Sequence, residues 1–146
     1  MAERTSSQRD SSNAKRASGM ETVFRTVAII TAIAILTEFF LAGLGVFDGV
    51  HSGATAGDTA AFDPHKAVGY LVAGLGAVAL IVAAVARLGG RIVGMTAALV
   101  LLAGPVQALL AHAGEDDGAA WGALHGLVGA LILALAVILV RAEPQR

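Results

Sequence analysis

The sequence predicts an all-α fold, a four-transmembrane-helix antiparallel bundle with both termini cytoplasmic. Three observations lead to this prediction. The 146 residues are 56% hydrophobic and only 14% charged, with a mean hydropathy of +0.75, which is more apolar than an ordinary soluble domain. Four apolar runs are long enough to cross a bilayer. Lysine and arginine gather on one side of these runs.

The predicted elements follow the apolar runs in order. Residues 1–20 are polar and rich in Ser and Arg, which predicts a disordered basic N-terminal tail. A transmembrane domain is expected over 21–142, followed by a short tail at 143–146, and its helices lie at about 24–47, 64–86, 92–111 and 119–140. Each run reaches the roughly 20 residues that a membrane-spanning helix needs. The first run is longer than the apolar part of a secretory signal, so we interpret it as a membrane helix.

The distribution of basic residues predicts the orientation. Nine of the ten lysine and arginine residues fall on one side of the four predicted helices, and Lys66 is the exception. Cytoplasmic segments carry such an excess. The sequence therefore predicts a multi-pass protein of the cytoplasmic (inner) membrane with its N-terminus inside, and two loops outside, at about 48–63 and 112–118.

Composition excludes several classes of function. The net charge is −1, and a nucleic-acid partner would need a concentrated basic face, so none is expected. The chain contains no cysteine, which rules out disulfides, thiolate metal sites and cysteine nucleophiles. Redox chemistry would therefore require a bound cofactor.

A five-residue pattern, H-x-x-V-G, occurs twice, beginning at His65 and at His125. The second and fourth predicted helices run in the same direction, so both histidines enter the membrane from the outer side at similar depth. Residues four apart share a helix face, which places Gly69 beside His65 and Gly129 beside His125.

These glycines allow two interpretations. Small residues let membrane helices pack closely, and a histidine at the interface commonly contacts only lipid headgroups. Alternatively, the glycines make room for a planar macrocycle between two imidazoles, as six-coordinate haem b requires. Under this second interpretation His65 and His125 are the ligands of the haem iron, and Gly69 and Gly129 belong to the cofactor-binding set.

Two further polar residues lie inside apolar runs, where they are costly unless they are partnered. Glu38 is a candidate catalytic group, although a protonated carboxyl that bonds to a neighbouring helix explains it equally well. Gln107 joins the cofactor-binding set; it follows Pro105, whose missing amide can kink the helix. His51 and His112 are more typical of a loop and a helix end, with His112 kept as a further candidate metal ligand.

The chain resembles a known group of proteins. The stretches EFFLAGLGVF (38–47), PHKAVGYL (64–71) and ALHGLVGALILALAVILVR (123–141) look like a family of small bacterial four-helix membrane proteins of unknown function. More distantly, the layout is similar to one half of haem A synthase and to other haem b-binding four-helix bundles, which implies His65 and His125 as haem ligands. The chain departs from haem A synthase in having no cysteine pair and in having Phe62 three residues before His65.

The leading functional hypothesis is a single-haem b protein that transfers electrons at the outer face of the membrane, with quinol or an external acceptor and with Glu38 as a proton relay. No histidine or methionine pair lies in the cytoplasmic half, so a second haem is not expected. Two alternatives stay open. One is a non-enzymatic subunit or scaffold that packs with other subunits or with itself. The other is a divalent-metal site built from the four histidines, His51, His65, His112 and His125.

Overall fold

The computed structural model describes residues 2–52 and 60–143, and the regular elements in these ranges are all helical. The all-α prediction is therefore confirmed. The elements in chain order are α1 (Ala2–Ser52), the 3₁₀-helix η1 (Ala60–Phe62), α2 (Asp63–Val85), α3 (Gly90–Leu101), the π-helix η2 (Leu102–Val106), α4 (Gln107–Asp117) and α5 (Ala119–Arg141).

In the described part of the chain, four helical segments are long and apolar enough to cross a membrane, which agrees with the predicted number of spans. They are Lys15–His51, Ala60–Val85, Gly90–Gly114 and Ala119–Arg141. The third span consists of α3, η2 and α4, which join end to end without a break. Their composition fits a lipid bilayer, because a helix satisfies its own backbone hydrogen bonds where no water is present.

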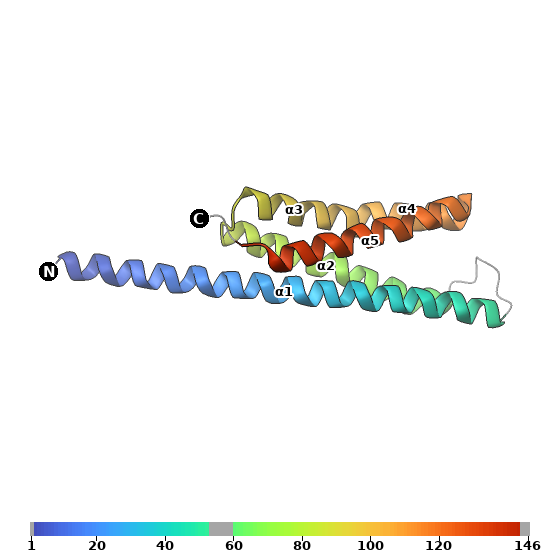
Figure 1. The fold of residues 1–146 in the computed structure, drawn as a ribbon, viewed down its shortest axis with the longest axis horizontal. Helices are drawn as coiled ribbons and strands as arrows, with labels where there is room; N and C mark the ends of the chain where they lie inside the picture. Colours follow the sequence, from blue (N-terminus) through green and yellow to red (C-terminus); the bar gives the residue numbers. More distant parts are fainter. Residues whose placement is uncertain (1, 53–59, 144–146) are drawn as a thin grey trace.

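The four spans run alongside one another (Figure 1), and their packing pairs arrange them as a square. α1 packs against α2 and α5, α2 packs against α3, and α5 packs against α4. α2 and α5 therefore lie on a diagonal of the square. Its core is made mainly of aliphatic side chains and alanines, including Ile35, Val72, Leu99, Ile132 and Leu139.

The first helix is longer than predicted. The structure has helix from Ala2, where the sequence predicts a disordered tail over 1–20. The segment contains no proline, and three Ala and three Arg are among its residues; both residue types favour a helix once a neighbouring span has nucleated it. Figure 1 shows α1 continuing past the other helices at its N-terminal end.

The two predicted outer loops also differ from expectation. α4 continues to Asp117, so the loop expected at 112–118 is helical except at Gly118, whose φ of 111° ends the helix. The loop expected at 48–63 is helical at both described ends, and residues 53–59 lie outside the described part of the chain. Residues 144–146 of the predicted C-terminal tail do too.

Leu99 is a core side chain only 2% exposed, whereas Leu101 on the same helix is 57% exposed. Leu99→Ala is expected to lower the free energy of unfolding by about 2–5 kcal/mol, since it removes packed atoms and leaves a cavity. Leu101→Ala, the matched control, should change it little. Thermal unfolding in a mild detergent measures both variants, and equal effects would contradict the core position of Leu99.

Candidate functional site

The two histidines of the repeated pattern meet inside the bundle. His65 lies in the first turn of α2 and His125 in the second turn of α5. Their helices lie on a diagonal, yet the ring centroids are only 6.0 Å apart, with the ring planes at 74°. The imidazoles therefore bridge the interior at the end of the bundle where α1 leads toward α2 and α4 toward α5.

Each imidazole is held by a backbone carbonyl of the preceding span. His65 Nδ1 lies 3.2 Å from the carbonyl oxygen of Glu38, and His125 Nδ1 lies 3.2 Å from that of Gln107. A carbonyl oxygen can only accept, so each Nδ1 carries the hydrogen and donates it. The neutral tautomer then leaves the Nε2 lone pair of both rings available to a ligand.

Polar side chains fill the space over both glycines. A Cβ atom added at Gly69 would come within 2.8 Å of Glu38 Oε1, and one at Gly129 within 3.2 Å of Gln107 Nε2 and of the Phe39 ring. The open space predicted beside each imidazole is therefore occupied by these side chains. The glycines let a carboxyl and an amide enter the interior, where a larger residue would push them out.

The two polar side chains differ in their partners. Glu38 Oε1 lies 3.8 Å from His65 Nδ1, with the two side chains 22% and 17% exposed. Gln107 Oε1 is buried and has no hydrogen-bond partner among the residues that the structure describes. Leaving such an acceptor unpaired costs about 1–3 kcal/mol. The amide oxygen of Gln107 is thus the group at this site that most requires a partner.

The two halves of the bundle repeat one arrangement. In each half, a histidine bonds to the backbone carbonyl of a Glu or Gln, whose side chain covers the glycine four residues after that histidine. The two helices also bury the same position after the histidine, because Val72 and Ile132 each come seven residues after the histidine of their own helix. The spans α1 and α3–α4 are therefore equivalent, and so are α2 and α5.

The π-helix accounts for one difference between the halves. In the first half, three buried residues, Phe24, Ala28 and Thr31, precede Glu38 by 14, 10 and 7 residues. In the second half, the corresponding buried residues, Ile92, Thr96 and Leu99, precede Gln107 by 15, 11 and 8 residues. Each separation is therefore longer by one residue in the second half. A π-helix contains one residue more than the α-helical turn it replaces. In η2 the Gln107 amide donates to Leu102, five residues back, and Pro105 has no amide to give. This insertion turns Gln107 toward the site.

The other predicted metal ligands lie elsewhere. His51, in the last turn of α1, and His112, on α4, have exposed side chains. Among the side chains that the structure describes (residues 15–51, 60–114 and 118–143), no group of three histidine, cysteine or acidic residues is placed to hold a metal ion. The geometry thus assembles His65, His125, Glu38 and Gln107 and does not bring the four histidines together.

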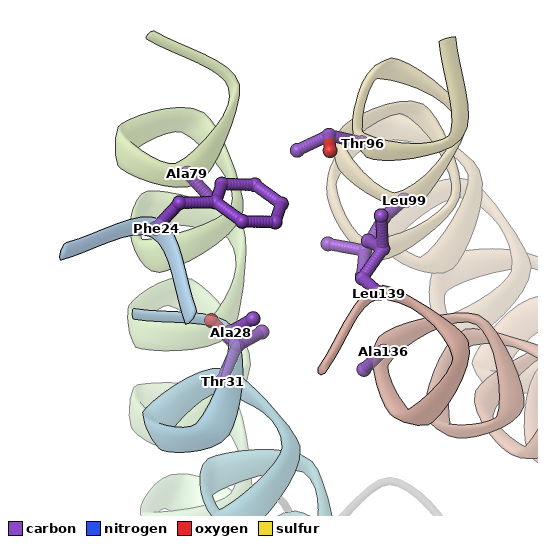
Figure 2. A pocket seen from close by; sticks show the side chains of 8 residues that line it. All are labelled: Phe24, Ala28, Thr31, Ala79, Thr96, Leu99, Ala136 and Leu139. Atoms are coloured by element: carbon purple, nitrogen blue, oxygen red, sulfur yellow. The ribbon is translucent and has the colours of Figure 1, made fainter. Parts of the chain in front are cut away.

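The interior beyond the site, toward the other end of the bundle, is nearly closed. A cavity of about 10 Å³ lies there, and its lining includes Phe24, Ala79, Leu99 and Ala136. Figure 2 shows these side chains around it. That volume holds at most one water molecule. The lining hydroxyls of Thr31 and Thr96 already donate to carbonyls of their own helices, so the cavity offers a ligand no free donor.

Gly114 allows α4 and α5 to approach closely beside the site. A Cβ atom there would lie 3.1 Å from the backbone nitrogen of Gly122, and backbone cannot move aside as a side chain can. Gly114→Leu is expected to destabilise the protein by about 1–3 kcal/mol through overpacking. Gly126→Leu is the control, because a Cβ atom at Gly126 meets nothing within 4 Å. Thermal unfolding compares them, and an undisturbed Gly114→Leu protein would rule out this close contact.

Sequence reasoning missed the aromatic neighbours of the site. The Phe62 ring lies edge-on to His65, with centroids 6.5 Å apart, and the Phe39 ring lies over Gly129. Phe39 directly follows Glu38, but nothing in its spacing indicates that it would reach α5. That contact depends on how the spans pack.

Comparisons with known proteins identify the chain only at the level of a family. Neither curated proteins nor solved structures gave a match, so nothing supports the resemblance to haem A synthase. Residues 38–115 match a family of unknown function, DUF6220, and the matched range includes Glu38, His65 and Gln107 but not His125. Since the match covers more than half of the 146 residues, the chain belongs to the DUF6220 family of unknown function.

Proposed function

We propose that the protein binds one haem b between His65 and His125 and transfers electrons at one face of the membrane. The observation behind this proposal is the pair of imidazoles, 6.0 Å apart between centroids, with both Nδ1 atoms held by carbonyls. Such bonds from the second ring nitrogen fix the tautomer and orientation of metal-ligating histidines. Two histidines on facing helices of a four-helix bundle are also a common way to hold a cofactor.

The spacing of the two rings fits a shared metal centre. A metal–nitrogen bond is about 2 Å long and an imidazole nitrogen lies about 1 Å from its ring centre, so two rings on opposite sides of one metal ion have centroids about 6 Å apart, and rings at a smaller angle lie closer together. The measured 6.0 Å agrees with this value. When bound, haem would supply one-electron chemistry, and its potential would depend on its axial ligands and their hydrogen bonds.

The residues around the ligands have definable roles in this proposal. The carbonyls of Glu38 and Gln107 hold the two imidazoles in place. The side chains of Glu38 and Gln107 fill the spaces over Gly69 and Gly129, and a macrocycle would require them to turn aside. A role for Glu38 as a proton relay, and for quinol as the electron partner, remains part of the proposal. So does an outer-face position in the cytoplasmic membrane, which rests on the distribution of basic residues.

A divalent cation is the second candidate for the same site. It is favoured by the oxygen atoms next to the imidazoles, the Glu38 carboxyl and the unpaired, buried amide oxygen of Gln107. Imidazole nitrogen with carboxylate or carbonyl oxygen suits several first-row metals. Such an ion would give the Gln107 oxygen the partner that it lacks. The Glu38 carboxyl, which lies on the Nδ1 side of His65, would have to turn toward the ion.

An absorption spectrum decides between these candidates. Full-length protein would be purified in mild detergent from cells supplied with a haem precursor, and its spectrum recorded after air oxidation and after dithionite reduction. Haem b predicts a Soret band with sharp reduced α and β bands. A bound divalent cation predicts about one equivalent of metal by elemental analysis without those bands. If neither signal appears at full haem and metal supply, both proposals are wrong, and a packing subunit or scaffold is left.

A further inference from the structure

A groove lies at the opposite end of the bundle from the histidines. It is lined by α1 on one side and by the α2–α3 turn, the start of α3 and the end of α5 on the other. Its volume is about 330 Å³, within the range of small-ligand pockets. We propose that this groove binds one anionic phospholipid, with the phosphate at Arg25 and an acyl chain along the apolar wall.

The lining has the two chemical halves that an amphiphile needs. Buried Leu88, Ile92 and Leu139 form an apolar wall, each no more than 3% exposed. Opposite them, α1 contributes the exposed guanidinium of Arg25 and the hydroxyls of Ser18 and Thr26. The Thr22 hydroxyl also lines the groove but donates to the Ser18 carbonyl oxygen. Arginine forks match phosphate oxygens in a bidentate way, and hydroxyls add further donors.

The charge around the groove favours an anion. Exposed basic side chains lie one or two residues from lining residues on each contributing segment, namely Arg16, Arg87, Arg91 and Arg141. Glu21 is the one acidic side chain among the lining residues, and it already has an interaction partner within the protein. Basic pockets between membrane helices bind anionic headgroups in this way. Because this end also carries the excess of basic residues that predicts the cytoplasmic side, the lipid would come from that leaflet.

The test measures thermal unfolding of the full-length, delipidated protein in detergent. Added phosphatidylglycerol is expected to raise the midpoint by about 5 °C, as a ligand that binds only the folded state does. Equal amounts of phosphatidylcholine, or inorganic phosphate alone, should not. Arg25→Gln is expected to remove most of the shift. Lys15→Gln is the matched control, since it removes the same charge from exposed α1 surface outside the groove.

A second variant distinguishes the loss of the lipid site from a general effect of lost charge or lost folding. Thr22→Trp fills the groove while keeping Arg25, and should also remove the shift if the lipid occupies this volume. The proposal would be overturned if phosphatidylcholine raised the unfolding midpoint as much as phosphatidylglycerol does. It would also be overturned if phosphatidylglycerol raised the midpoint of Arg25→Gln as much as that of the parent protein. A full shift with phosphate alone would replace the lipid site by a simple anion site and would equally overturn it.

Discussion

His125→Ala and His65→Ala are each expected to abolish the absorption bands of six-coordinate haem b, and the double variant to bind no haem. Each imidazole would supply one of the two axial bonds, and the rings lie on different helices, α2 and α5. A single remaining ligand cannot give the sharp reduced bands of a bis-histidine haem. The effect is therefore loss of the signal and not a partial decrease, as measured by the reduced-minus-oxidised spectrum.

The controls for this prediction are the two remaining histidines. His51 and His112 have exposed side chains, and His112 lies on α4, the span from which Gln107 reaches the site. His51→Ala and His112→Ala should leave the bands and the haem stoichiometry unchanged. If His112→Ala removed the bands while His125→Ala did not, the pairing of His65 with His125 would be wrong.

Deleting Ala103 is expected to have the second largest effect, because Ala103 lies in the π-helix Leu102–Val106. Removing one residue restores α-helical register and turns Gln107 by about 100° relative to Leu99. Leu99 and Gln107 cannot then both face the interior. Either the packing of Leu99 or the carbonyl contact of His125 is lost. The loss of core packing alone is worth about 2–5 kcal/mol, and unfolding is expected at a midpoint lower by roughly 10 °C.

Ala103→Gly is the control for the deletion, since it keeps the number of residues in η2 and removes only a methyl group. Its midpoint should fall by much less than that of the deletion. Circular dichroism against temperature, in the same detergent, compares the two proteins with the parent chain. If the deletion were as stable as Ala103→Gly, the extra residue would have no part in aligning Gln107 with the site.

Much of the site could be predicted from the repeated H-x-x-V-G pattern. Helical periodicity places Gly69 and Gly129 next to their histidines whatever the tertiary structure is. The cost of a polar group in the membrane singles out Glu38 and Gln107 as residues that need partners. The sequence does not show where those partners are. The structure puts Glu38 over Gly69 and Gln107 over Gly129, in the spaces where the sequence had suggested room for a macrocycle.

Two polar segments differ in the structure from what their local composition predicts. The polar residues of 2–20 continue α1, since a helix already formed in the apolar span extends at little cost through residues that favour it. The acidic stretch near Asp117 likewise ends α4 instead of forming a loop, and only Gly118 leaves helical geometry. In both places the neighbouring helix decides the conformation of a polar segment.

The sequence by itself determined that the chain is helical and that it has four spans, because a run of about 20 apolar residues has few other stable forms in a bilayer. It also determined which residues need a polar partner. Only the tertiary structure decided that His65 and His125 meet across a diagonal of the bundle, 6.0 Å apart. That meeting depends on which spans are neighbours and on the extra residue of η2. The choice of neighbours follows from packing among all four spans at once, which no single stretch of sequence specifies.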